Sequence, residues 1–544
     1  MSTPDSARAR FEAAVGRAAR RPAGAFWTPE AVAELLLDAA GYDGDPARRV
    51  VDPACGGGAL LYAAARRMRA RGAAPQAVAR ALAGVDADAR AIAAARAALG
   101  ALLEGHLPEL RCADALAEPP AVGPGDLVIA NPPWVRFADV PRPLRAALRP
   151  LWERYGLFSL GGQAARLGGG DKDLALLHAL VAADRYLRPG GRLAILITLE
   201  ALKAKGAGEG FRRFRLPGGE PLAPVCAHDL VALRAFPGAT GKPAILVLDR
   251  GRAPCWPVRF VVHRRDGAVH TTTARPVGGR DRAPWQVGEA AGLRRPEDGP
   301  PAYRARLGAR VEPYGVYWLR VLARDAATGR VQVENLPELG KRLLPHVRAE
   351  MEDTFLRPAL RGRDVRAGRA QPVLHALLVQ DPIRRAPIPE AHLRAQAPLT
   401  FAYLSQFREV LLRRGSRPVR ELAERTAFYA QYGVGAYTCA RHLVVWNRMG
   451  RELRAATTGA PVLPTDTCCL IACTNAHEAR FLAQLLNSRA VAQALACASD
   501  PGRGFASPGA IDLLALPRFD PEDPRHAAVA AGDAATAEAL LERR

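Results

Sequence analysis

A repeated alternation of apolar strand, short turn and helix constrains the fold of this chain more than any other feature. Residues 48–72, RRVVDPACGGGALLYAAARRMRARG, predict a strand, a glycine-rich turn and a helix, and residues 81–100, ALAGVDADARAIAAARAALG, repeat that order. Residues 125–134, GDLVIANPPW, supply another strand, and residues 173–199 predict a long helix followed by a strand. This alternation predicts an open, largely parallel α/β sheet whose ligands bind beyond the carboxyl ends of the strands.

One further helix is expected before the first strand, over TPEAVAELLLDAAG at residues 28–41. Thr28 can cap it, Pro29 suits its first turn, and Gly41 ends it.

Length and charge bound the class of protein. A chain of 544 residues with 49% apolar residues predicts two or more domains with a sizeable core. The net charge of +22 favours a polyanionic partner, nucleic acid first and an anionic membrane surface second. The cations are nearly all arginine, so an arginine-rich solvated surface from a GC-rich genome is the alternative.

No apolar run is long enough to span a bilayer, and the N-terminus lacks the apolar core of a signal peptide. The nine cysteines form no CxxC pair. A disulfide framework or zinc cluster is therefore not expected, no other metal site is predicted, and a reducing cytoplasm fits best.

The glycine turn after the first strand places an acid and three glycines where a helix begins. Asp52 can hold a cationic group, and Gly56, Gly57 and Gly58 let a ligand approach the backbone closely. A phosphate-binding loop is the rival interpretation, but the turn has neither the GxxxxGK[ST] lysine nor GxGxxG spacing. Many glycine-rich turns only pack a helix onto a sheet, so the turn needs further support.

That support comes from acids at the next strand ends. Asp86 follows the second strand, where an acid can take both hydroxyls of a ribose. Asp114, in RCADAL, can accept a hydrogen bond from an adenine amine. Each acid alone is better explained as a helix cap. Three acids at successive strand ends favour a nucleoside with a positively charged centre.

The motifs FWTP, DPACGGGALL, GVDAD, CADAL, NPPW and YLRPGGRLAIL occur in this order. The series resembles that of the amino-group DNA methyltransferases, in the gamma arrangement found in large adenine methylases of restriction and phage-defence systems. It covers residues 25–250 and continues more loosely to the C-terminal stretches. The resemblance implies a Rossmann-like α/β S-adenosylmethionine-dependent methyltransferase sheet followed by a C-terminal α+β target-recognition domain.

The resemblance also implies the cofactor, S-adenosyl-L-methionine, and the residues around it. Phe26 and Thr28 would contact its methionine part, and Asp52 with Ala54, Gly56 and Gly58 of the turn would surround its amino-acid moiety. Asp86 would bind the ribose, and Asp114 the adenine.

The catalytic motif implied by the family is Asn131, Pro132, Pro133 and Trp134, with Phe236 as a second aromatic wall for the target base. The Asn131 side-chain oxygen and the Pro132 carbonyl can accept both hydrogens of an exocyclic amine and localise its lone pair. Trp134 can stack on a base that has left the duplex. An isolated NPPW would instead be interpreted as a tight turn closed by an aromatic.

The sequence departs from the family pattern in three places. The turn reads GGG where GSG is commoner, and Trp134 stands where Tyr or Phe is usual. The segment GGQAARLGGGDKD at residues 161–173 is unusually glycine-rich, which predicts a mobile loop over the substrate.

The domains are expected at residues 1–25 (an arm), 26–260 (catalytic), 261–339 (a connecting region with some strand content) and 340–544 (target recognition). Residues 340–520 are expected to grip double-stranded DNA, since arginines interleave with aromatics in the 401–449 stretch. These residues are Tyr403, Phe407, Arg408, Arg413, Arg414, Arg417, Arg420, Phe428, Tyr429, Tyr432, Tyr437, Arg441 and Trp446. An amphipathic helix with a solvated basic face is the alternative.

The sequence therefore predicts site-specific methylation of adenine N6 in DNA, in the nucleoid of a prokaryotic cytoplasm. Adenine is preferred to cytosine because NPP, rather than SPP, opens the motif. A methyltransferase acting on RNA or protein glutamine, a fused restriction–methylation enzyme and a non-catalytic DNA-binding subunit are the alternatives. Only about 25 residues precede FWTP, so a nuclease activity would come from a separate nuclease or another defence-system subunit.

Overall fold

The structure of the protein is a computed structural model. It describes residues 27–135, 140–157, 174–203, 208–236, 241–294, 299–340, 342–366, 368–415, 417–450, 452–499, 502–503 and 505–542. The chain forms two compact units, residues 1–288 and 289–544. Phe26, the predicted N-terminal arm and the glycine-rich segment at 161–173 lie outside the described residues.

The first unit is built around one ten-stranded sheet with the order β10-β9-β8-β6-β7-β5-β4-β1-β2-β3. Its strands are β1 (Val50–Asp52), β2 (Leu82–Asp86), β3 (Glu109–Cys112), β4 (Gly125–Ala130), β5 (Leu187–Thr198), β6 (Leu222–Asp229), β7 (Pro243–Arg250), β8 (Val258–His263), β9 (Val269–Pro276) and β10 (Trp285–Val287). The five strands from β3 to β5 run parallel. Their carboxyl ends therefore share one edge, which is where the predicted site residues were expected.

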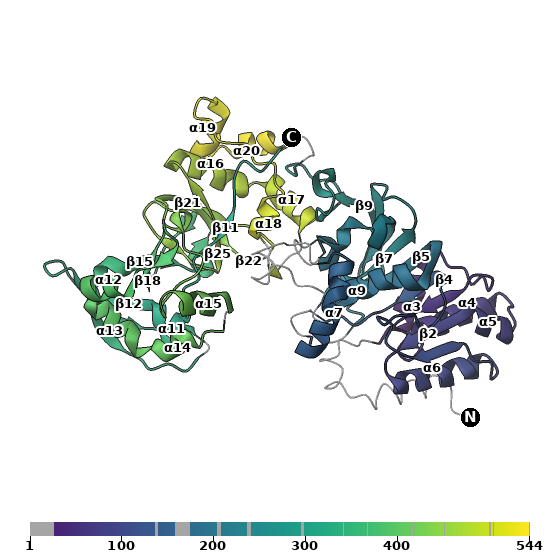
Figure 1. The fold of residues 1–544 in the computed structure, drawn as a ribbon. Helices are drawn as coiled ribbons and strands as arrows, with labels where there is room; N and C mark the ends of the chain where they lie inside the picture. The colour runs from purple at the N-terminus through teal and green to yellow at the C-terminus, as the bar shows by residue number, and fades with distance from the viewer. Residues whose placement is uncertain are drawn as a thin grey trace. The chain divides into compact units, whose positions relative to one another are not determined.

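Helices cover both faces of this sheet (Figure 1). The helices are α3 (Glu30–Ala39), α4 (Ala59–Ala70), α5 (Pro75–Ala81), α6 (Ala89–Leu102), α7 (Arg142–Arg154), α9 (Leu174–Val181) and the short α10 (Glu200–Lys203). Alternate residues of a strand enter opposite cores: Val51 and Val128 pack with α7 and α9, whereas Val50 and Leu127 pack with α3, α4 and α6. The predicted α/β fold is confirmed, and burial on both faces explains why these strands are apolar throughout.

The sheet is less parallel than predicted. Strand β7 runs antiparallel to both β5 and β6, and β9 runs antiparallel to β8 and β10. Residues 261–288 of the predicted connecting region extend this sheet, and residues 289–339 belong to the second unit. Their glycine, proline and charge content marks hairpin turns between short strands.

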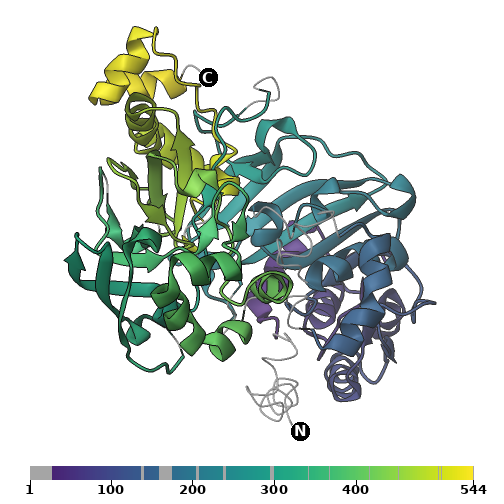
Figure 2. The same cartoon turned by 60° about the vertical axis from the view of Figure 1, so that its left-hand side comes forward.

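The second unit combines two main sheets with helices. A six-stranded sheet contains β14 (Arg348–Glu352), β13 (Arg330–Asn335), β12 (Trp318–Asp325), β18 (Leu374–Leu377), β15 (Leu356–Leu360) and β24 (Leu463–Pro464). A four-stranded sheet has the order β11 (Arg306–Leu307), β25 (Cys468–Cys473), β21 (His442–Asn447) and β23 (Ala455–Thr457). Figure 2 shows this unit in green to yellow. The predicted α+β class of the C-terminal domain is confirmed.

Helices pack on both of these sheets. The core of the six-stranded sheet includes residues of α12 (Glu390–Gln396), α13 (Pro398–Gln406) and α14 (Arg408–Leu412), and α15 (Arg417–Arg425) follows α14 in the chain. The helix α16 (Ala476–Leu486) covers the four-stranded sheet and is followed by α17 (Arg489–Ala498), α18 (Pro508–Ile511), α19 (Pro524–Ala531) and α20 (Ala534–Glu542). Within the described part of the chain, no helix is both long enough and apolar enough to cross a membrane.

The arginine–aromatic stretch at 401–449 is largely structural. Tyr403, Phe407, Phe428, Tyr429 and Trp446 are buried in the core, so they cannot stack on bases. The Arg414 guanidinium is also buried and donates to the carbonyls of residues 411, 428 and 430 at 2.6–2.8 Å. For these five rings the predicted stacking on bases is therefore wrong. Four of them pack in the core of the six-stranded sheet, and the Trp446 indole N–H donates to the Ala506 carbonyl at 2.8 Å. Tyr432 and Tyr437 are half-buried.

Candidate nucleoside and amine site

The site lies where the parallel strands β1, β2 and β4 end. Asp52 and Asp86 are the last residues of β1 and β2, and Asn131 directly follows β4. Strand register places Asp52 opposite Gly84, two residues before Asp86, and Val51 opposite Val128. The structure thus brings three of the predicted residues to neighbouring positions on one edge of the sheet.

The carboxyl of Asp52 is the most unusual group at this edge. Its side chain is 1% exposed, and Oδ1 accepts a hydrogen bond from the Ala54 backbone N–H at 3.0 Å. The other oxygen, Oδ2, is buried and has no hydrogen-bond partner among the described residues. Burial, with a smaller contribution from the negative charge of Asp86, raises the pKa of Asp52 to about 8. A buried carboxyl with an unused oxygen is suited to hold a cationic group.

Asp86 fastens the glycine turn to the second strand. Its Oδ2 accepts from the Gly56 backbone N–H at 2.9 Å, and its Oδ1 accepts from the Asp88 N–H at 2.9 Å. Burial raises its pKa, and these backbone bonds partly offset that effect. Asp86 therefore shapes the turn itself, in addition to any contact with a ribose.

Two glycines of the turn adopt backbone conformations that other residues rarely adopt. Gly56 has φ +50° and Gly58 has φ +82°. A Cβ at Gly56 would meet no atom within 4 Å, whereas one at Gly58 would lie 3.0 Å from Ala95 on α6. Gly58 thus allows α4 and α6 to approach, and Gly56 leaves space above the backbone for a ligand.

Trp27 and Thr28 are adjacent residues that contact both halves of the site. A Cβ placed on Gly57 would lie 2.6 Å from the Trp27 indole, so the ring rests directly on the glycine turn. The Thr28 hydroxyl, which is buried, accepts a hydrogen bond from Asn131 Nδ2 at 3.1 Å. Since one peptide link joins these two contacts, the glycine turn and the Asn131 motif lie close together.

Contrary to the prediction, Thr28 does not cap the following helix. Helix α3 begins at Glu30 with Pro29 at the capping position and no side-chain cap, although Gly41 follows its end as expected. The hydrogen bond from Asn131 Nδ2 to Thr28 fixes the orientation of the amide, whose Oδ1 is an acceptor. The sequence did not predict this role of Thr28, nor any role for Trp27, because both contacts are long-range.

The aromatic residues of the predicted base pocket come together but not as parallel walls. The rings of Trp134 and Phe236 have centroids 5.0 Å apart and an interplanar angle of 66°. Phe236 is 6% exposed and belongs to the core, while Trp134 is half-buried. In this edge-to-face arrangement no base fits between the two rings, so Phe236 supports the Trp134 ring.

The remaining predicted residues have local structural partners. Asp114 is exposed, and its Oδ1 accepts from the Leu116 N–H at 2.9 Å, as a turn-capping acid does. Pro132 is buried and Pro133 is half-buried, directly after β4. Among the described residues, no group of three or more His, Cys, Asp or Glu side chains is placed to hold a metal ion.

The Thr28–Asn131 bond gives a first prediction. Replacing Thr28 with Val should lower the rate of the predicted amine methylation about 10-fold, the equivalent of one lost hydrogen bond of about 1.4 kcal/mol, and weaken cofactor binding by a smaller factor. Thr28→Ser keeps the hydroxyl and is the matched control. Single-turnover kinetics and a cofactor titration separate the two effects, and equal losses of rate in Val and Ser variants would contradict a positioning role.

The Trp27–Gly57 contact gives a second prediction. Gly57→Ala should destabilise the protein by about 1–3 kcal/mol, because its Cβ and the Trp27 ring compete for the same space. The double variant Trp27→Ala/Gly57→Ala should lose less stability than the sum of the two single variants. Urea unfolding measures the three values, and strict additivity would show that the ring does not occupy this position in solution.

Comparison with known proteins adds an independent result. Residues 13–277 match the family model described as N-6 DNA methylase. The comparison with curated proteins gives no significant match.

Among solved structures, the type IIL restriction-modification enzyme MmeI, solved in complex with DNA, is 13% identical with a TM-score of 0.59. That alignment covers 100% of this chain and 74% of MmeI, so the two chains share a fold. The type IIG restriction endonuclease BpuSI is 12% identical, with 97% of this chain and 63% of that chain covered and a TM-score of 0.39. The M protein of the type I restriction enzyme EcoKI is 16% identical, with 44% and 49% covered and a TM-score of 0.32.

Proposed function

We propose that this chain, whose residues 13–277 match the N-6 DNA methylase family model, is a site-specific methyltransferase that modifies adenine N6 in double-stranded DNA within a restriction-modification or phage-defence system. The observation that carries the proposal is the pair of contacts from Trp27 to the glycine turn and from Thr28 to Asn131. These contacts keep a nucleoside-binding edge and an amine-binding motif side by side, as methyl transfer between two bound molecules requires.

The cofactor proposed is S-adenosyl-L-methionine, which supplies an electrophilic methyl group on a sulfonium when bound. The described residues fit such a cation: Asp52 has a buried oxygen without a partner, and Gly56 leaves open space above its backbone. Asp52 would hold the amino group, Asp86 the ribose hydroxyls and Asp114 the adenine. Phe26 and Thr28 would border the methionine part.

Asn131 and its neighbours prepare the target amine. The amine is a weak nucleophile because its lone pair is delocalised into the adenine ring. Asn131 Oδ1 and the Pro132 carbonyl would accept its two hydrogens and draw it towards tetrahedral geometry, which localises the lone pair. Pro133 restricts the backbone that carries both acceptors.

Trp134 would receive the base after it leaves the duplex. Stacking on an aromatic ring is worth roughly 1–3 kcal/mol per base, comparable with the few kcal/mol that unstacking costs. The Phe236 ring packs edge-to-face with the Trp134 ring and supports its position. No cysteine is needed, and burial raises the pKa of the Cys55 thiol well above its usual value.

The second unit is proposed to bind the DNA and select the site, with a separate nuclease or another defence-system subunit as a partner. The net charge of +22 supports an anionic partner of this kind. Such a protein would work on nucleoid DNA in the cytoplasm.

The proposal is tested by modification-sensitive sequencing of DNA from cells that express the wild-type protein or Asn131→Ala. We expect N6-methyladenine at one short sequence motif with the wild type and none with the variant. Identical modification patterns in the two strains would refute the proposal.

A further inference from the structure

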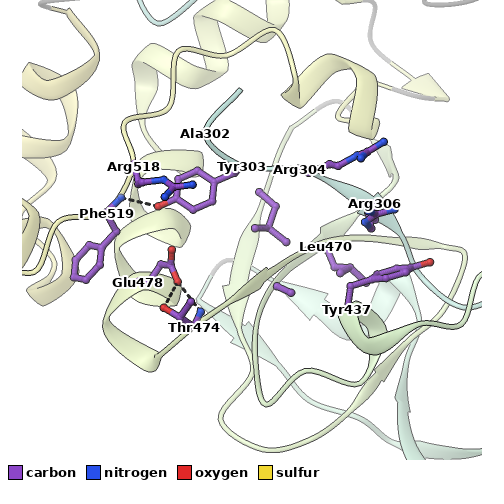
Figure 3. A pocket seen from close by; sticks show the side chains of 12 residues that line it. Ala302, Tyr303, Arg304, Arg306, Tyr437, Leu470, Thr474, Glu478, Arg518 and Phe519 are labelled. Atoms are coloured by element: carbon purple, nitrogen blue, oxygen red, sulfur yellow. Dashed lines mark hydrogen bonds between the residues drawn. The ribbon is translucent and has the colours of Figure 1, made fainter. Parts of the chain in front are cut away.

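A pocket of about 420 Å³ lies in the second unit, and Tyr437 of the arginine–aromatic stretch is one of its lining residues (Figure 3). It is formed where β11, β25 and the start of α16 meet residues 518 and 519. Arg304, Arg306 and Arg518 line it together with Tyr303 and Tyr437, while the buried side chain of Leu470 contributes its apolar wall.

The three arginines differ from most of the charged side chains in this unit. None of Arg304, Arg306 and Arg518 makes an ion pair or a hydrogen bond to any other described residue through its guanidinium, and Arg304 and Arg518 are exposed. Elsewhere in the unit, guanidinium groups such as those of Arg320 and Arg361 are paired with Glu334 and Asp364. Three uncompensated cations facing one hollow create a local excess of positive charge.

One acid lines the pocket, but its carboxylate is already engaged. Glu478 Oε2 accepts from the backbone N–H and the hydroxyl of Thr474 at 2.6 and 2.7 Å. The Glu478 N–H in turn donates to Asn475 Oδ1 at 2.9 Å, which caps α16. The helix end is therefore satisfied internally, and even with Glu478 the pocket keeps an excess of positive charge.

The aromatic side chains hold the wall in place. The Arg306 guanidinium lies over the Tyr437 ring at 4.7 Å from its centroid, and the Tyr437 hydroxyl donates to the Gly433 carbonyl at 2.9 Å. The Tyr303 hydroxyl accepts from the Phe519 N–H at 2.7 Å. Arginine forks suit phosphate oxygens, and the neighbouring aromatic surface suits the sugar or base next to a phosphate.

We propose that this pocket binds a phosphate group of a nucleotide unit, with Arg304, Arg306 and Arg518 as its ligands. The phosphate is a phosphodiester of the DNA strand, an identification that rests on the proposed function. The pocket then positions the second unit on the duplex backbone and carries no sequence information itself. A free nucleotide has the same chemistry and is the other source that the experiment must separate.

The test uses the full-length protein with the double variant Arg304→Gln/Arg518→Gln, in which both substituted side chains are exposed and unpaired among the described residues. The matched control is Arg366→Gln/Arg369→Gln, two exposed arginines of the same unit on the hairpin β16 (Val365–Arg366) and β17 (Arg369–Ala370). This hairpin lies by β23, at the opposite edge of the four-stranded sheet from β11. Circular dichroism melts confirm that both variants fold.

Two ligands are titrated: a fluorescent 30-base-pair duplex over a series of salt concentrations, and AMP. We expect the pocket variant to bind the duplex about 5- to 10-fold more weakly, with a salt slope reduced by about 0.9 per lost phosphate contact, while the control changes far less. Unchanged duplex binding together with AMP binding that only the pocket variant loses would support the phosphate site with a free nucleotide as its source. Loss of neither ligand, or equal losses in the control, would overturn the proposal.

Methylation of DNA by the wild-type protein is measured in parallel, so the two proposals can fail separately. If the wild-type protein methylates DNA and the pocket variant binds both ligands as the wild type does, only the phosphate pocket is refuted. If the wild-type protein does not methylate DNA but the pocket variant loses binding of phosphate ligands, the proposed function is refuted and the phosphate pocket is supported.

Discussion

Asn131→Ala should abolish methylation while the protein still binds its cofactor. The variant removes Oδ1, one of two acceptors for the target amine, and also the hydrogen bond that Thr28 receives from Nδ2. By analogy with the removal of one preorganised hydrogen-bonding group from an active site, we expect kcat to fall on the order of 10³-fold. Cofactor affinity should change little, because Asp52, Asp86 and the glycine turn are untouched.

The measurement combines single-turnover methylation of a duplex with calorimetric titration of S-adenosyl-L-methionine. Thr28→Val is the companion variant, since it removes the same hydrogen bond and keeps the Asn131 amide. We expect a far larger loss of rate for Asn131→Ala than for Thr28→Val. If the two variants were equally impaired, Asn131 would act only through its contact with Thr28, and the amine-activating role would be wrong.

Asp52→Asn should weaken cofactor binding roughly 10- to 100-fold, the loss expected when a charged hydrogen-bond partner is removed. The change should also alter the dependence of affinity on pH. Because the Asp52 pKa is about 8 in the ligand-free protein, binding an ammonium group must first expel its proton. Affinity should therefore rise with pH, by nearly a factor of ten per pH unit between pH 5 and 7, and this slope should vanish in Asp52→Asn.

The same carboxyl affects stability in the ligand-free state. In the unfolded chain Asp52 has the ordinary pKa of 3.8, and folding raises it to about 8. Above pH 4 the unfolded state is ionised while the folded state holds a proton, so this group destabilises the fold increasingly as pH rises towards 8. At pH 7 the penalty is on the order of 4 kcal/mol, since each pKa unit corresponds to about 1.4 kcal/mol.

Asp52→Asn should consequently be more stable than the wild type at pH 7 to 8 and similar at pH 4. Urea unfolding at these pH values, without ligand, measures the difference. A variant less stable than the wild type at pH 8 would show that the carboxyl is ionised and compensated in the folded protein.

The sequence was sufficient to place Asp52, Asp86 and Asn131 at one edge of the sheet. Each residue ends or follows an apolar strand, and the carboxyl ends of parallel strands meet. The direction of β7 could not be predicted in this way, because a strand buried on both faces is apolar throughout whether its neighbours run parallel or antiparallel to it. Residues 261–288 extend the first sheet, which the sequence did not indicate because polar, glycine-containing turns separate β8, β9 and β10.

Contacts between distant residues account for most of what the sequence left open. The Thr28–Asn131 bond joins residues 103 positions apart, and no local pattern encodes it. The edge-to-face packing of Trp134 on Phe236 likewise depends on tertiary structure. Arg414 is buried and its guanidinium donates to three backbone carbonyls. The sequence alone does not distinguish such a structural arginine from one that binds a phosphate.

The most direct test of the central claim is transfer of a labelled methyl group. Purified protein is incubated with duplex DNA and S-adenosyl-L-methionine carrying a trideuterated methyl, and the nucleosides are then analysed by mass spectrometry. We expect the label in N6-methyladenine with the wild-type protein and no label with Asn131→Ala. Label in methylcytosine, or no labelled nucleoside from the wild-type protein, would contradict this expectation.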